Sequence, residues 1–139
     1  MAKVAVITAP GCEEGETLTI VDVLRRAEIA CDMVGLGAQE IAGTHHIAMR
    51  CDTVFDGSLD AYDMVVLPGG YGGSDAMRDS DELIATLQAA SKRGAWICAI
   101  CAAPRHSAAP GCCRASALPA IPACATRLRT RAPGWTPPS

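Results

Sequence analysis

The residue most able to do chemistry is a cysteine at the end of an apolar run, AWICAICAAP (95–104). Cys101 ends the run, and the small residues Ala102 and Ala103 follow it, which allows a tight turn from strand into helix. Backbone N–H groups at such a turn favour the thiolate, which is the nucleophilic and readily oxidised form. A free cysteine is also a common small core residue, so its position alone leaves both interpretations open.

Cys98 and Cys101 also form a Cys-x-x-Cys pair, a spacing that binds zinc or cycles between dithiol and disulfide. No second cysteine pair or histidine pair lies at ligand spacing, so a zinc site is the weaker interpretation. The eight cysteines do not follow the spacing of a secreted disulfide framework. We therefore expect neither a metal ion nor another cofactor.

Two further groups could act together with the cysteine. Glu16 could exchange a proton with a nearby thiol, although Glu13, Glu14 and Glu16 would ordinarily be solvated acids in the first turn of a helix. Gly69 and Gly70 leave their backbone N–H groups uncovered, and such groups can stabilise an oxyanion. An ordinary turn is the commoner reason for a glycine pair.

The scaffold that must position these groups alternates apolar strands with amphipathic helices. The expected strands cover 3–8, 29–36, 62–70 and 95–100, the expected helices 13–28 and 80–94, with shorter strands and turns in 40–62 and a glycine-rich loop up to 73. Ser80 and Gly94 are the expected N-cap and stop of the second helix. The pattern predicts an α/β fold with a mostly parallel sheet that is covered on both faces and binds ligands at the carboxyl ends of its strands.

Composition and charge narrow the class of protein. The 139 residues, half of them hydrophobic, suit a single domain. No apolar run is long enough to cross a bilayer and the start does not resemble a secretory signal, so we expect a cytoplasmic protein. Residues 1–104 hold all 15 acidic groups and residues 105–139 hold five arginines without an acid. That basic end lacks interleaved aromatic residues or a binding motif, so neither nucleic acid nor membrane is an expected partner.

Three segments in order, APGCEEGETLTIVDVLRRA, YDMVVLPGG and AICAAP, resemble signature segments of the ThiJ/PfpI superfamily. The resemblance covers residues 1–104 and is closest to the branch that contains the Parkinsonism-associated protein (DJ-one) and the bacterial deglycase-chaperones. It implies a flavodoxin-like α/β sandwich that forms a homodimer in intact relatives. It also implies that Cys101 is the nucleophilic, oxidation-sensitive cysteine and Glu16 the glutamate that hydrogen-bonds its sulfur. The implied donors of backbone N–H groups around the site are Gly69, Gly70 and Ala102.

The same resemblance implies a cysteine-dependent activity of glyoxalase III or protein deglycase type, on methylglyoxal or glycated protein adducts. In the implied reaction the Cys101 thiolate attacks the aldehyde to form a hemithioacetal, and Glu16 shuttles a proton until lactate is released. A non-enzymatic oxidative-stress sensor or redox-regulated chaperone is the alternative. Peptidase activity is disfavoured because Ala102 stands where the protease-like branch has a histidine, and the later His and Glu of the glutamine amidotransferases are not found.

The pattern changes abruptly after Pro104. Residues 105–139 contain six of the nine prolines, which oppose both a helix and an inner strand, whereas relatives continue with a long helix and further strands. We interpret this segment as an aberrant, irregular tail on the N-terminal portion of the family domain, and hypothesise a frameshift near Pro104. The hypothesis predicts poor folding and impaired activity, with a non-functional frameshift product as the second alternative. His106 matches no family position, so no catalytic histidine is assigned.

Overall fold

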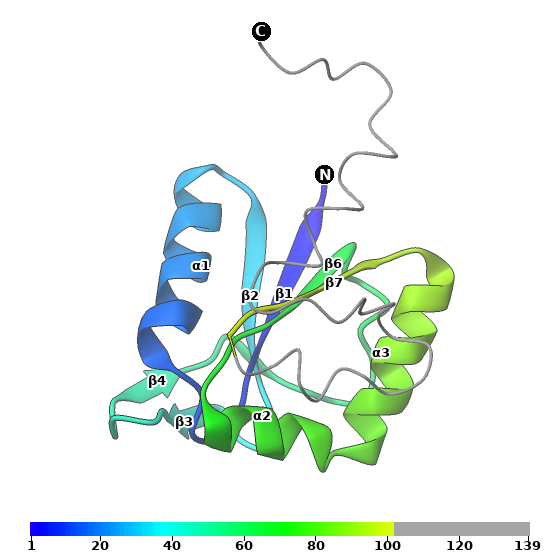
Figure 1. Cartoon of the computed structure of the whole chain (residues 1–139). Helices are drawn as coiled ribbons and strands as arrows, with labels where there is room; N and C mark the ends of the chain where they lie inside the picture. The colour runs from blue at the N-terminus through cyan, green and yellow to red at the C-terminus, as the bar shows by residue number, and fades with distance from the viewer. Residues whose placement is uncertain (102–139) are drawn as a thin grey trace, which may run out of the picture.

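The structure, a computed structural model, describes residues 1–101 (Figure 1). The predictions for Ala102, His106 and the tail 105–139 lie outside the described residues. The elements are β1 (Lys3–Thr8), α1 (Glu14–Arg26), β2 (Ala30–Gly35), β3 (Glu40–Ala42), β4 (Ala48–Arg50), β5 (Thr53–Val54), β6 (Met64–Leu67), α2 (Tyr71–Arg78), α3 (Asp81–Arg93) and β7 (Trp96–Ala99). No helix within these residues is long and apolar enough to span a membrane.

Five strands form a parallel sheet in the order β5-β2-β1-β6-β7. β1 is central and pairs with β2 on one side and with β6 on the other. The remaining two strands, β3 and β4, form a separate antiparallel hairpin near the start of α1 (Figure 1). This architecture confirms the predicted α/β fold with a mostly parallel sheet.

The sheet lies between two helical layers, with α1 on one face and α3 on the other (Figure 1). Successive residues of β1 point to opposite faces, as the two-residue period of a strand requires. Ala5 and Ile7 enter the core cluster that contains Leu83 and Leu87 of α3. Val4 and Val6 enter the cluster that contains Val21 of α1 and the apolar side chains of the hairpin, Ile41 and Met49. Continuous apolar strands are therefore explained by burial on both faces.

Helix α2 differs from the sequence prediction, which placed a glycine-rich loop up to Gly73. The helix begins at Tyr71, and its two glycines lie against the loop that follows β1. A Cβ on Gly73 would lie 2.6 Å from Cys12 Cα, and one on Gly72 would lie 3.2 Å from Gly11 Cα. The close approach of the two backbones therefore explains glycine at these positions in spite of its low helix propensity.

Candidate functional site

The site lies where the carboxyl ends of β1, β6 and β7 meet. Backbone hydrogen bonds join the segments that follow these strands: the Glu13 N–H donates to the Gly69 carbonyl over 3.0 Å, and the Ile100 N–H donates to the Leu67 carbonyl over 3.2 Å. Because the chain leaves β1 and β6 in opposite directions across the sheet, this edge is the switch point at which open α/β sheets bind ligands. The acidic first turn of α1, the diglycine loop and Cys101 converge here, as the sequence predicts.

Cys101 has a strained backbone and an exposed, free thiol. Its φ of 53° lies in the left-handed region, which a side chain rarely adopts. Such a conformation costs about 1–3 kcal/mol and persists where the surrounding structure holds it, often at functional sites. The geometry is that of a sharp turn directly after β7, the position in which a nucleophile-elbow residue is presented.

Gly69 is the contact point between Cys101 and Glu16. A Cβ built on Gly69 would lie 2.5 Å from Cys101 Cβ, 3.1 Å from its Sγ and 2.5 Å from Glu16 Oε2. The sulfur and the carboxylate therefore flank the same small volume, which only a glycine leaves open. The Gly69 N–H donates to Glu16 Oε2 over 2.8 Å and fixes the carboxylate in this place.

The backbone donors expected around the site have different positions. The Gly69 N–H faces inward, but it is used by Glu16, so a bound oxyanion would have to compete with that carboxylate. Gly70 has a φ of 92°, and a Cβ there would lie 2.6 Å from both Glu13 N and Gly11 O. This position therefore requires glycine for both its conformation and its packing. The third expected donor, Ala102, lies outside the described residues.

The acids of the first turn are not the solvated side chains that their sequence position suggests. Glu13 is the N-cap of α1, and its Oε2 accepts a hydrogen bond from the Glu16 N–H over 2.7 Å. The Glu14 side chain is almost completely buried, with 3% of its surface exposed. The interpretation as solvated acids is therefore wrong for Glu14, and for Glu13 it misses the capping role. The sequence gives no signal for that role, because glutamate is not among the preferred N-cap residues.

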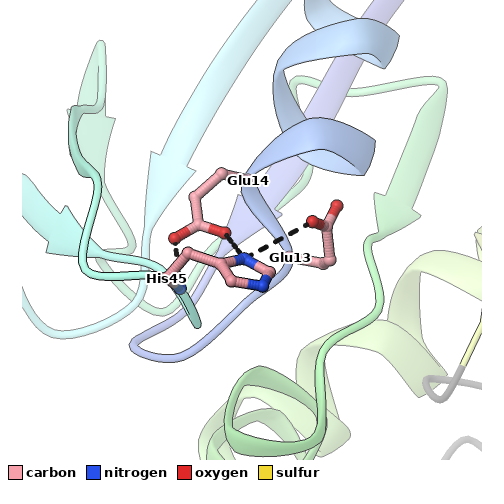
Figure 2. A group of neighbouring side chains, drawn as sticks. All are labelled: Glu13, Glu14 and His45. Atoms are coloured by element: carbon pink, nitrogen blue, oxygen red, sulfur yellow. Dashed lines mark hydrogen bonds and ion pairs between the residues drawn. The ribbon is translucent and has the colours of Figure 1, made fainter.

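Glu14 is buried because it joins α1 to the loop between β3 and β4 (Figure 2). Its Oε1 accepts hydrogen bonds from the backbone N–H groups of His45 and Ile47, over 2.6 and 3.3 Å, and its Oε2 lies 3.0 Å from His45 Nδ1. Burial by itself would raise the pKa of the Glu14 carboxyl. Hydrogen bonds from its own N–H, from the His45 ring and from the two backbone donors outweigh burial and lower the pKa from 4.5 to about 2.

Glu13, Glu14 and His45 each offer a ligand atom, and these atoms lie within 4.8 Å of one another. The donors around Glu14 explain the cluster without a cation, since both of its oxygens already have hydrogen-bonding partners. We therefore interpret the Glu14–His45 contact as a structural clamp that holds the hairpin against the start of α1. His45 lies in the segment 40–62, for which the sequence predicts only short strands and turns, and nothing in the sequence indicates its partner.

The cysteines of the described segment divide by environment. The free thiols of Cys12, Cys31 and Cys51 are buried, and burial raises the pKa of each. Cys98 packs in the core on the α1 side of the sheet. Cys101 is the exposed free thiol of residues 1–101, which sets it apart from the buried cysteines of the same segment.

Comparison with protein families finds a match to the DJ-1/PfpI family over residues 2–136, which extends beyond the segment 1–104 on which the resemblance rests. The Drosophila melanogaster protein dj-1beta is 39% identical over 131 residues, which cover 92% of this chain and 70% of the relative. The Danio rerio Parkinson disease protein 7 homolog is 37% identical, with coverage of 78% and 59% respectively.

Solved structures give the same result. The crystal structure of Drosophila melanogaster DJ-1beta superposes with a TM-score of 0.73 at 41% identity, over 78% of this chain and 60% of that one. A DJ-1 superfamily protein from Salmonella typhimurium superposes with a TM-score of 0.75 at 35% identity, over 81% and 62%. The chain thus spans less than two thirds of the length of these two proteins.

Proposed function

The chain belongs to the DJ-1/PfpI family, and from this premise we propose that it is a cysteine-dependent enzyme of glyoxalase or deglycase type. The substrates are methylglyoxal or the adducts that it forms on proteins. One observation carries the proposal: a free, exposed thiol on a strained turn flanks the same open volume at Gly69 as the Glu16 carboxylate. A nucleophile and a proton carrier in one small space are what the reaction needs.

In the proposed reaction, the Cys101 sulfur forms a bond to the aldehyde carbon of methylglyoxal, and the carbonyl oxygen takes up a proton to give a hemithioacetal. Glu16 then removes the hydrogen of that carbon as a proton and returns it to the neighbouring ketone carbon. The first carbon is thereby oxidised to a thioester and the second reduced to an alcohol. Water cleaves the thioester, so that one methylglyoxal and one water give one lactic acid and the free thiol.

The backbone around the thiol supplies the electrostatic part of this proposal. The Gly70 N–H makes no hydrogen bond within residues 1–101, and it adjoins the Gly69 contact point, so we assign it the role of oxyanion donor. We also propose a cytoplasmic homodimer, as in intact relatives, and turnover that is impaired by the altered segment after Pro104.

The test is lactate formation from methylglyoxal by the full chain and by Cys101→Ser. We expect slow but measurable turnover that the substitution abolishes. Cys31→Ala is the matched control, because it removes a buried free thiol near the start of β2, whereas the site lies at the carboxyl ends of the strands. It should leave the rate unchanged. Equal rates for wild type and Cys101→Ser would refute the proposal.

A redox sensor or redox-regulated chaperone is the second candidate function. It is favoured by the contrast between the exposed Cys101 and the three buried free thiols of the described segment, whose pKa values burial raises. Mild peroxide should then convert Cys101 to its sulfinic acid before it modifies Cys12, Cys31 or Cys51, as peptide mass spectrometry would show. A chain with neither turnover nor selective oxidation would instead be the non-functional frameshift product.

A further inference from the structure

Three hydrogen bonds connect Glu13, Gly69 and Glu16 in a closed ring. The Glu13 N–H donates to the Gly69 carbonyl over 3.0 Å. The Gly69 N–H donates to Glu16 Oε2 over 2.8 Å, and the Glu16 N–H donates to Glu13 Oε2 over 2.7 Å. Both ends of Glu16, its backbone and its carboxylate, are therefore held by the ring.

The Glu13 carboxylate is the part of this ring that a side chain supplies. Glutamate is not a preferred N-cap, because serine, threonine, asparagine and aspartate reach the same N–H with a shorter side chain that loses less conformational freedom. The Glu13 side chain is nevertheless held by more than one neighbour. Its Oε1 lies 3.9 Å from His45 Nδ1, and only 31% of its side-chain surface is exposed.

Gly15 supports the same interpretation. A Cβ on Gly15 would lie 3.1 Å from Glu13 Oε2 and 3.6 Å from Oε1. Glycine in a helix costs about 1 kcal/mol relative to alanine, and here it leaves room for the carboxylate to fold back over the first turn. Gly15 thus leaves the Glu13 carboxylate room beside the first turn of the helix.

From this ring we infer that Glu13 is a positioning residue, which holds Glu16 in register with the Cys101 sulfur. The inference rests on the proposed function, in which Glu16 carries the proton. Glu13 acts through the backbone of Glu16, three residues further along the helix. Its loss should therefore lower the rate of the chemical step more than it weakens substrate binding, because a carboxylate displaced by about 1 Å loses up to 10²-fold in rate.

The experiment compares Glu13→Ala, Glu13→Gln and Ser80→Ala in the full chain. Ser80 is the N-cap of α3 and accepts from the Leu83 N–H over 3.3 Å, so Ser80→Ala removes a comparable cap from a helix that contributes no residue to the site. We expect Glu13→Ala to lower kcat for methylglyoxal by about tenfold or more, with a smaller change in KM. Glu13→Gln keeps an acceptor oxygen at the same reach and should retain most of kcat, and Ser80→Ala should retain all of it.

A second readout does not depend on turnover: the pH dependence of Cys101 alkylation by iodoacetamide, followed by peptide mass spectrometry. Glu16→Gln should change this profile, and Glu13→Ala should reproduce most of the change while Ser80→Ala leaves the profile of wild type. If wild type forms no lactate, the proposed function fails and this profile alone decides the inference. The inference would be overturned if the profile of Glu13→Ala or of Glu16→Gln superimposed on that of wild type. Equal losses of kcat in Glu13→Ala and Ser80→Ala would also overturn it.

Discussion

Replacing Gly69 by alanine would place a methyl group between Cys101 and Glu16 and so tests their contact most directly. The new methyl group would start 2.5 Å from Cys101 Cβ and 2.5 Å from Glu16 Oε2, well inside van der Waals contact. Gly69 does not have a positive φ, so alanine fits its backbone and the effect is purely steric. The Glu16 carboxylate is the flexible neighbour and should swing away, breaking its hydrogen bond to the Gly69 N–H.

The expected magnitude follows from the size of this displacement. Overpacking by one methyl group costs about 1–3 kcal/mol of unfolding free energy. A carboxylate moved by about 1 Å should lower the rate of lactate formation by about 10²-fold. The assays are urea denaturation of the folded chain and methylglyoxal turnover at the same temperature and pH.

Ser80→Ala serves as the matched control, since loss of that cap costs about 1 kcal/mol of stability in a helix that contributes no residue to the site. It should unfold at a lower urea concentration than wild type and keep its turnover. The reasoning would be refuted by a Gly69→Ala chain that is destabilised as expected and yet forms lactate at the wild-type rate.

Three further changes test the parts that surround the site. Glu14→Gln should lower the stability of the fold at neutral pH and make that stability depend less on pH in acid. A carboxyl whose pKa is lowered in the folded state stabilises the fold above pH 4.5, and this contribution is lost as the pH falls towards 2. Urea denaturation at several pH values measures this, and an unchanged pH dependence would contradict it. Gly43→Ala should expel the Glu14 side chain, because the added Cβ would start 2.3 Å from its Cγ. The His45 and Ile47 N–H groups should then exchange hydrogen faster, and unchanged exchange rates would contradict the clamp. Leu83→Ala in α3 should cost about 2–5 kcal/mol, since the side chain is fully buried, and a melting temperature equal to wild type would be incompatible with the described core.

The fold could be predicted from the sequence wherever a local pattern decides the structure. The two-residue alternation in β1 and the apolar face of α3 follow directly from burial on both faces of a sheet. The ends of α3 were also predictable, because Ser80 caps the first turn and Gly94 adopts the left-handed conformation that stops a helix. Helix α2 was not, because its glycines are explained only by a backbone that approaches from the loop after β1.

The site shows the same division. Cys101, Glu16 and Gly69 were candidates from their places at strand and helix ends, the family resemblance implied their roles, and the parallel topology brings them together. The buried Glu14 could not be distinguished from a solvated acid, because its partners His45 and Ile47 come from a distant hairpin. Long-range hydrogen bonds of this kind leave no periodicity in the sequence, so only the structure assigns them.

The central claim is that Cys101 is the reactive thiol and that Glu16 governs its reactivity. Iodoacetamide labelling of the native chain at a series of pH values, with peptide mass spectrometry, measures both statements at once. We predict that Cys101 is alkylated before the buried Cys12, Cys31 and Cys51, and that Glu16→Gln shifts the pH dependence of its alkylation alone. Equal labelling of all four thiols, or a Cys101 profile that Glu16→Gln leaves in place, would contradict the account.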